Sequence, residues 1–167
     1  TQAVWQDVLV VPEGHFYNSK QNPQMRAYRL MTQGDGLKAE EVWSVSAAFG
    51  NCSTAVACCG QVLFSDGRCF RSFAVETGVA APNVCKPGIK DSPHVINAGL
   101  SVAGDRVVAL GEDGTLMVLQ VGKEGLTQEH LLPLPAPDRM AMYRAAPTFA
   151  RGCMYIHGNK ALTCIGR

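Results

Sequence analysis

The sequence predicts an all-β protein in which one antiparallel sheet unit is written several times, and three observations predict it. Apolar residues come in short runs rich in β-branched and aromatic side chains, as in GQVLF from Gly60 and RCFRSFAV from Arg68. Turn residues such as Asp66-Gly67 separate the runs, because Asp bonds its own backbone and Gly tolerates positive φ. No long window shows the i, i+3, i+4, i+7 spacing of an amphipathic helix, so little helix is expected.

The unit that begins at Gly60, GQVLFSDGRCFRSFAVETG, returns along the chain. GDRVVALGEDGTLMVLQVG starts at Gly104 and GCMYIHGNKALTCIG at Gly152, while the copy from Gly14 has a longer tip. The leading glycines are 46, 44 and 48 residues apart (from 14 to 60, 60 to 104 and 104 to 152). A strand-rich period of roughly 40–50 residues is typical of β-propeller blades, so we predict a propeller segment of about four four-stranded antiparallel blades.

The predicted blades span residues 7–46, 53–86, 98–132 and 146–166. In the first blade we expect strands at 8–12, 15–17, 26–31 and 39–45, with Trp43 facing inward on the outer strand. Residues 1–6 are expected to be the outer strand of a neighbouring or closing blade, because AVWQ resembles EEVWS. Trp5 and Trp43 would then be the same structural residue.

Two ring geometries follow from that expectation. Residues 1–6 finish a blade of a longer propeller that lies upstream, or they finish the blade that begins at Gly152, which has only three expected strands, and so close a four-bladed ring. We favour the first geometry, because the inner strands are small and apolar and the start of the chain resembles a cut within a blade.

The composition of the chain limits the classes of partner that we expect. Charged residues make up 17% of the 167 residues and the net charge is +1, so nucleic acid is disfavoured as a partner. No apolar run reaches the ~18 residues that a transmembrane helix needs, so no membrane-spanning segment is expected. The chain starts without an initiator Met and without the basic and apolar regions of a signal peptide, so we expect a mature chain, a domain or a fragment.

The chain has seven cysteines, an odd number, so at least one thiol is free or pairs outside the chain. Most of them stand among apolar strand residues, and we interpret them as small buried hydrophobic side chains. A disulfide framework would suit a shorter chain with a smaller core. The cysteines therefore determine the cellular compartment only weakly.

The repeat resembles that of quinoprotein-type propellers, also called the PQQ-like repeat. The match rests on FAVETG at 73–78, on Trp43, and on the terminal CMYIHGNKALTCIGR, and it covers about residues 8–166. The resemblance implies a seven- or eight-bladed ring of which this chain is the C-terminal half. It also implies that Trp43 docks on the next blade.

The adjacent Cys58 and Cys59 are the candidate cofactor site. The resemblance implies a vicinal disulfide against pyrroloquinoline quinone (PQQ), as in the quinone-dependent alcohol dehydrogenases, whereas strand alternation alone places the two side chains on opposite sides of a sheet. Those enzymes also hold Ca²⁺ with Glu, Asn and Asp, and no matching Asn/Asp pair stands at the inner-strand ends here. The four histidines show no metal-binding spacing, so neither a metal site nor a catalytic residue is predicted.

A second candidate is a mixed aromatic and basic patch of Arg139, Tyr143, Arg144 and His157, which precedes and enters the last blade. Arg and Tyr are frequent hot-spot residues in protein interfaces, so the patch would suit a protein partner. The alternative is a solvated loop between blades.

The function that these observations favour is a non-catalytic binding or scaffold module that engages a protein or other partner through one propeller face, without a cofactor. The alternative is half of a PQQ-dependent oxidoreductase that uses PQQ with Ca²⁺. A third possibility is a ring completed by the remaining blades of another chain or a second copy. The resemblance suggests a periplasmic or cell-envelope location, with a cytoplasmic one as the alternative.

Overall fold

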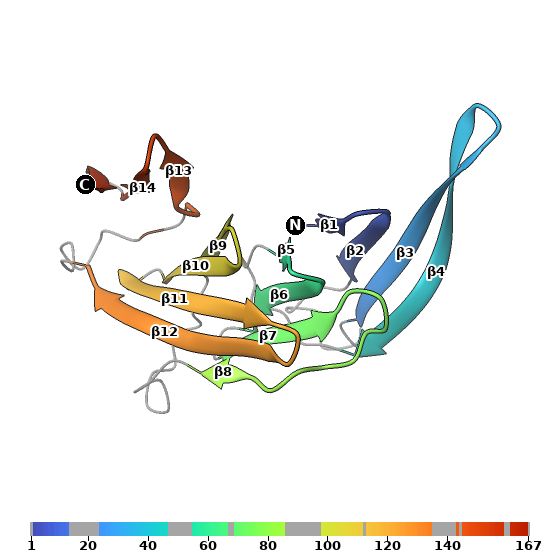
Figure 1. Cartoon of the computed structure of the whole chain (residues 1–167), viewed down its shortest axis with the longest axis horizontal. Helices are drawn as coiled ribbons and strands as arrows, with labels where there is room; N and C mark the ends of the chain where they lie inside the picture. The colour runs from blue at the N-terminus through green and yellow to red at the C-terminus, as the bar shows by residue number, and fades with distance from the viewer. Residues whose placement is uncertain are drawn as a thin grey trace.

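The computed structural model describes residues 2–13, 24–46, 55–66, 69–85, 98–111, 113–134, 143, 145–158 and 161–166. These residues form four antiparallel sheets and no helix, which confirms the all-β prediction (Figure 1). The expected strand at 15–17 lies outside the described residues.

Each sheet is a simple meander of consecutive strands. The first sheet contains β1 (Ala3–Trp5), β2 (Val8–Glu13), β3 (Gln24–Gln33) and β4 (Gly36–Ser46), and the second contains β5 (Val56–Cys58), β6 (Gln61–Ser65), β7 (Cys69–Ala74) and β8 (Val84–Cys85). The third contains β9 (Ala98–Ala103), β10 (Arg106–Gly111), β11 (Thr115–Gly122) and β12 (Gly125–Pro133), and the fourth contains β13 (Thr148–Ala150), β14 (Cys153–His157) and β15 (Leu162–Ile165).

The core consists of three apolar clusters, and each cluster lies between two consecutive sheets. Because side chains alternate along a strand, a middle strand serves both neighbours. Val62 and Phe64 of β6 pack against the first sheet, whereas Leu63 packs with residues of the third. In β10, Val107 packs toward the second sheet and Val108 toward the fourth. Each sheet therefore buries the apolar face or faces that meet a neighbouring sheet.

The first sheet differs from the sequence expectation. Residues 3–5 do not form the outer strand of another blade, because β1 pairs with β2 and is the innermost strand of the first sheet. The turn at Gln6 and Asp7, with Gln6 at φ 53°, makes this hairpin possible. Trp5 is therefore on an inner strand and Trp43 on the outer one, so they are not the same structural residue.

Trp43 joins the first two sheets, as the resemblance implied. Its indole N–H donates a 2.6 Å hydrogen bond to the backbone carbonyl of Val75. Its ring packs on Gly78, where an added Cβ would lie 2.8 Å from Cδ2 of the indole. Gly78 has φ +68°, so glycine is suited to this position for both its conformation and its size.

A disulfide corrects the interpretation of the cysteines as small hydrophobic side chains. Cys69 and Cys85 are bonded and tie β7 to the outer strand β8, where the register places them opposite each other. Among the other described cysteines, only Cys58 is buried, while Cys59 and Cys164 are exposed and Cys153 is partly buried. The strand pattern could not reveal this pairing because β8 is only two residues long.

Candidate functional site

The first two strands of each sheet are joined by a two-residue turn, and these four turns form the candidate site. We call it the inner-hairpin face; its turns are Gln6–Asp7, Cys59–Gly60, Gly104–Asp105 and Arg151–Gly152. The marker glycines at 60, 104 and 152 all lie in these turns and have positive φ, while Gly14 lies outside the described residues. β1 lies beside β5 and β5 beside β9, so neighbouring turns come from adjacent inner strands.

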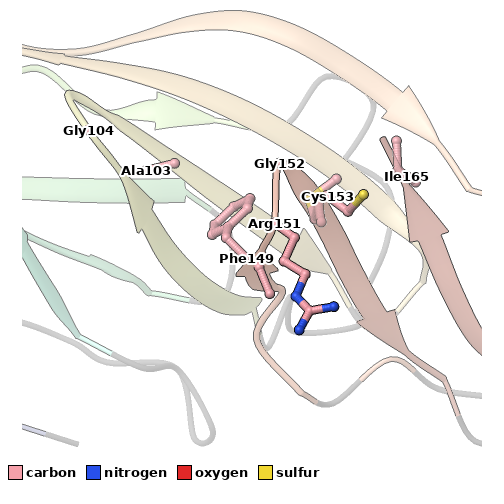
Figure 2. A pocket seen from close by; sticks show the side chains of 9 residues that line it. Ala103, Gly104, Phe149, Arg151, Gly152, Cys153 and Ile165 are labelled. Carbon is pink, nitrogen blue, oxygen red and sulfur yellow. The ribbon is translucent and has the colours of Figure 1, made fainter. Parts of the chain in front are cut away.

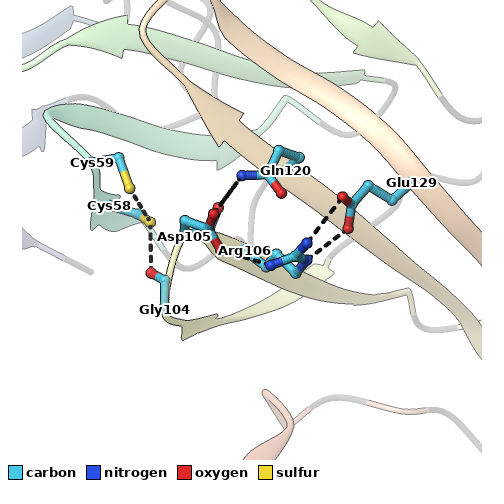
Figure 3. Close-up of polar contacts among 7 residues, drawn as sticks. All are labelled: Cys58, Cys59, Gly104, Asp105, Arg106, Gln120 and Glu129. Atoms are coloured by element: carbon cyan, nitrogen blue, oxygen red, sulfur yellow. Dashed lines mark hydrogen bonds and ion pairs between the residues drawn. The ribbon is translucent and has the colours of Figure 1, made fainter.

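Cys58 and Cys59 stand at the second of these turns, with their sulfurs 3.6 Å apart and not bonded (Figure 3). The Cys58 thiol donates to the carbonyl of Gly104 at 3.4 Å and so contacts the next turn. Burial, followed by the contact with Cys59, raises the pKa of Cys58 to about 12. Cys58 is buried and Cys59, with φ 51°, is exposed, so the contacting sulfurs stand at the boundary between the core and the solvent.

A polar network lies beside the thiols on the third sheet (Figure 3). Arg106 binds both carboxylate oxygens of Glu129, at 2.8 and 3.3 Å, and contacts Asp105 at 2.8 Å. The Gln120 amide donates to the Asp105 carboxylate at 2.8 Å, and this bond is the main cause of the lowered pKa of Asp105. Asp105 thus stays ionised, and its charge disfavours a thiolate at Cys58.

Arg29 of β3 links the first turn to the second sheet. Its guanidinium lies 3.3 Å from the Asp7 carboxylate and 2.5 Å from that of Glu76. Asp7 belongs to the β1–β2 turn, and Glu76 follows β7 in the second sheet. The ion pairs therefore orient two neighbouring blades at the same end as the Trp43 contact with Val75.

A shallow pocket of about 510 Å³ lies between the third and fourth sheets at this face (Figure 2). The β9–β10 turn forms one side, and the β13–β14 hairpin, with the Phe149 ring and the Arg151 guanidinium, forms the other. Phe149 is 40% exposed. The pocket combines apolar walls with one cationic side chain, and its lining residues are Ala103, Gly104, Phe149, Ala150, Arg151, Gly152, Cys153, Met154 and Ile165.

The structure describes two of the four residues of the predicted basic and aromatic patch, so the patch stays a prediction. Tyr143 is buried between the third and fourth sheets, where Cβ atoms added to Gly114 and Gly158 would lie 3.0 and 3.2 Å from its ring. Its ring fills the space that two glycines leave, so it packs in the core. His157 is exposed in β14, and Arg139 and Arg144 lie outside the described residues.

Sequence reasoning missed the charged residues of the inner-hairpin face, Asp7, Asp105 and Arg151. It also missed Arg29 and Arg106, which contact Asp7 and Asp105. The signal for Asp105 and Arg151 was present in the Gly104-Asp105 and Arg151-Gly152 pairs, which are two-residue hairpin turns. The described residues contain no group of three His, Cys, Asp or Glu side chains placed to hold a metal ion. In the part of the chain that the structure describes, no helix is long and apolar enough to cross a membrane.

No protein-family model matches the chain, and no curated protein matches it either. Among solved structures it is similar to a europium-containing methanol dehydrogenase, with a TM-score of 0.53 and 13% identity over 81% of this chain and 24% of that one. It is also similar to HIRA(644-1017), with a TM-score of 0.47 and 17% identity over 94% of this chain and 47% of that one.

The methanol dehydrogenase is a β-propeller, and at this level of identity the likeness concerns the fold alone. Its strand arrangement agrees with the four stacked meander sheets described above, so the chain has the β-propeller fold. The chain spans about a quarter of the length of that dehydrogenase chain.

Proposed function

We propose that the chain is a binding module that engages a protein partner through its inner-hairpin face. The observation that carries the proposal is the placement of Asp7, Cys59, Asp105 and Arg151, which come from four consecutive sheets and are all exposed at equivalent turns. Loops positioned by a rigid scaffold are where binding residues concentrate. The opposite charges of Asp105 and Arg151 favour a partner of mixed charge, because they would set its orientation.

A charge-reversal pair tests this role. Asp105→Lys combined with Arg151→Glu changes the face at two turns without touching a core residue, and His130→Asp on the exposed outer strand β12 is the matched control. We expect a partner recovered by chemical cross-linking in a cell-envelope extract to be lost with the double variant and kept with the control. Equal recovery of the same partner by both variants would contradict the proposal.

The free face of the first sheet supports further blades as a second kind of partner. Ala3 and Trp5 pack toward the second sheet, so Val4 between them points away and is 58% exposed. The register continues this row through Leu9 to Tyr28. Among the described sheets, the faces that meet a neighbouring sheet are buried. The uncovered face of the first sheet therefore fits a further blade, from another chain or a second copy. The mass of the purified chain in light scattering tests whether the further blade comes from a second copy. A monomeric mass would leave a different chain as the source of that blade.

One contact favours a different function, half of a quinone-dependent oxidoreductase. The Cys58 and Cys59 sulfurs are 3.6 Å apart at a turn of the inner-hairpin face. Ca²⁺ takes about six to eight oxygen ligands, and the described residues do not gather such a cluster, so we rank this function second. It predicts that PQQ with Ca²⁺ raises the melting temperature, because a ligand of the folded state stabilises it. It also predicts that Cys58→Ser abolishes this shift.

The Cys69–Cys85 bond supports a periplasmic or cell-envelope location, because structural disulfides persist in oxidising compartments and are rare in reducing ones. Alkylation of thiols in intact cells before lysis tests this. The proposal expects both cysteines to escape labelling, and labelling of both would favour the cytoplasm.

A further inference from the structure

The fourth sheet brings two thiols and a phenol together on the face that points away from the third sheet. Ile156 is buried against the third sheet, so Tyr155 beside it in β14 points the opposite way. The register pairs Tyr155 with Cys164 of β15, and Cys153 shares the face because it is two residues from Tyr155. Cys153 and Cys164 are therefore diagonal neighbours across one hairpin, within side-chain reach.

The absence of a side chain at Gly166 lets Cys153 lean across onto β15. A Cβ built on Gly166 would overlap the Cys153 sulfur, so that sulfur occupies the space beside the residue that stands two positions after Cys164. The neighbouring Cys164 thiol is the main cause of the raised pKa of Cys153, which agrees with this placement. The strand register and the space at Gly166 thus place the two cysteines on one face of the hairpin, as neighbours.

The pair is accessible and reduced in the structure. Cys164 is exposed and Cys153 is partly buried, in contrast to the buried Cys58. Directly paired cysteines such as Cys69 and Cys85 suit a disulfide, whereas diagonal Cα atoms are typically ~7–8 Å apart, just beyond the usual disulfide range of ~4.4–6.8 Å. A bond between Cys153 and Cys164 therefore requires the hairpin to tighten, and strained, exposed disulfides are the labile ones.

We propose that Cys153 and Cys164 are a thiol–disulfide exchange site that takes small disulfides of the glutathione type and closes into a reversible cross-strand bond between β14 and β15. This assignment does not rest on the turn residues that carry the proposed function, although Cys153 also lines the pocket at the inner-hairpin face, and it requires the free face of the fourth sheet to stay uncovered.

The exchange balances with the small disulfide as oxidant. The Cys164 thiolate attacks one sulfur of the disulfide, forms a mixed disulfide and expels the first small thiolate, which takes up the proton that Cys164 lost. The Cys153 thiolate then attacks the Cys164 sulfur, closes the protein disulfide and expels the second small thiolate. Two protein thiols are oxidised, and one small disulfide is reduced to two thiols.

The neighbours of Cys153 set the pH dependence. The groups facing it from its own strand and from β15 are the Tyr155 phenol and the Cys164 thiol; the thiol raises its pKa, and the phenol hydrogen bond partly opposes this. Ring closure requires the Cys153 thiolate, whose fraction increases as the pH approaches a raised pKa. The closing step should therefore accelerate with rising pH, beyond the range in which an ordinary thiol responds.

The sequence makes the test direct. Trypsin cleavage after Arg151, Lys160 and Arg167 separates residues 152–160 from 161–167, each with one of the two cysteines. Cleavage after Arg68, Arg71 and Lys90 separates Cys69 from Cys85 in the same digest, which provides an internal control; the Lys86–Pro87 bond resists trypsin. The full chain is reduced, treated with oxidised glutathione, quenched with a maleimide and digested. We expect peptides 152–160 and 161–167 to be recovered as one disulfide-linked species.

Variants distinguish thiol–disulfide exchange at Cys153 and Cys164 from the mere closeness of two thiols. With Cys153→Ser, glutathione should remain attached to Cys164, because no thiol can resolve the mixed disulfide. With Cys59→Ser, which removes another exposed thiol, the cross-link should form as in the unaltered chain. In a graded series of dithiothreitol concentrations, the Cys153–Cys164 bond should open at a concentration at least ~10-fold lower than Cys69–Cys85, since its geometry is strained. Unchanged circular dichroism of each variant excludes misfolding.

Two results would overturn the assignment. The first is full maleimide labelling of Cys153 and Cys164 under conditions that restore the Cys69–Cys85 bond. The second is opening of the Cys69–Cys85 bond before the other, which would make the Cys153–Cys164 bond a structural one and not an exchange site.

Discussion

The indole N–H of Trp43 in the first sheet donates a hydrogen bond to the carbonyl of Val75 in the second sheet. This single contact joins the outer strand of one blade to the turn that precedes the outer strand of the next. Arg29 adds ion pairs to Asp7 and Glu76 at the same end of the sheets. Neighbouring blades are thus joined by an apolar cluster with polar contacts at its rim.

Gly78→Ala should lower the free energy of unfolding by about 3 kcal/mol, because the new methyl group meets the Trp43 ring and the backbone has φ +68°. Gly34→Ala is the matched control. Gly34 has φ +61° but nothing within 4 Å of an added Cβ, so it should lose only about 1 kcal/mol. Urea unfolding measures both. If the two variants lose the same free energy of unfolding, the contact with Trp43 adds nothing to the cost of placing alanine at positive φ.

Tyr143→Ala should destabilise the chain by about 3–4 kcal/mol, because it opens a cavity between the third and fourth sheets. His157→Ala, at an exposed site, should change stability by less than about 0.5 kcal/mol. Chemical denaturation of the two variants tests whether Tyr143 is a core residue. A Tyr143→Ala variant that keeps its stability but weakens partner binding would support the predicted interface instead.

Cys85→Ser should lower the free energy of unfolding by roughly 2–4 kcal/mol, because it releases a cross-link between residues separated by 16 positions. Thermal unfolding with and without a reductant measures the effect. In reductant, the unaltered chain should have a melting temperature close to that of Cys85→Ser. The reductant should not lower the melting temperature of the variant itself. A reductant effect that persists in Cys85→Ser would point to a second stabilising disulfide.

Cys58 should make stability depend on alkaline pH. Its pKa is raised from 9.0 to about 12, mainly by burial, so the folded chain keeps a proton that the unfolded chain releases above pH 9.0. The stability that the buried neutral thiol contributes is complete below pH 9.0 and is lost as the pH rises from 9.0 toward the pKa of about 12 in the folded chain. Urea unfolding on both sides of pH 9.0 should show a steeper fall for the unaltered chain than for Cys58→Ala.

Cys59→Ala is the control for this comparison, and it should keep most of the steep slope, because burial is the main cause of the shift at Cys58. Identical slopes for the unaltered chain and Cys58→Ala would show that the buried thiol does not titrate in this range.

The sequence by itself determined the all-β class and three of the four sheets, because strand alternation and turn residues are local signals. The unit from Gly60 and the units from Gly104 and Gly152 needed only apolar runs separated by turns. The place of Trp43 on an expected outer strand, combined with the resemblance to the quinoprotein-type repeat, predicted the contact between the first two blades.

Tertiary structure decided what depends on partners distant in the sequence. Residues 3–5 form an inner strand because Ala3 and Val8 bury themselves against the second sheet, although AVWQ resembles an outer strand. Tyr143 is a core residue because two glycines on different elements leave room for its ring. The Cys69–Cys85 bond and the contact between Cys153 and Cys164 depend on strand register, which spacing along the chain does not specify.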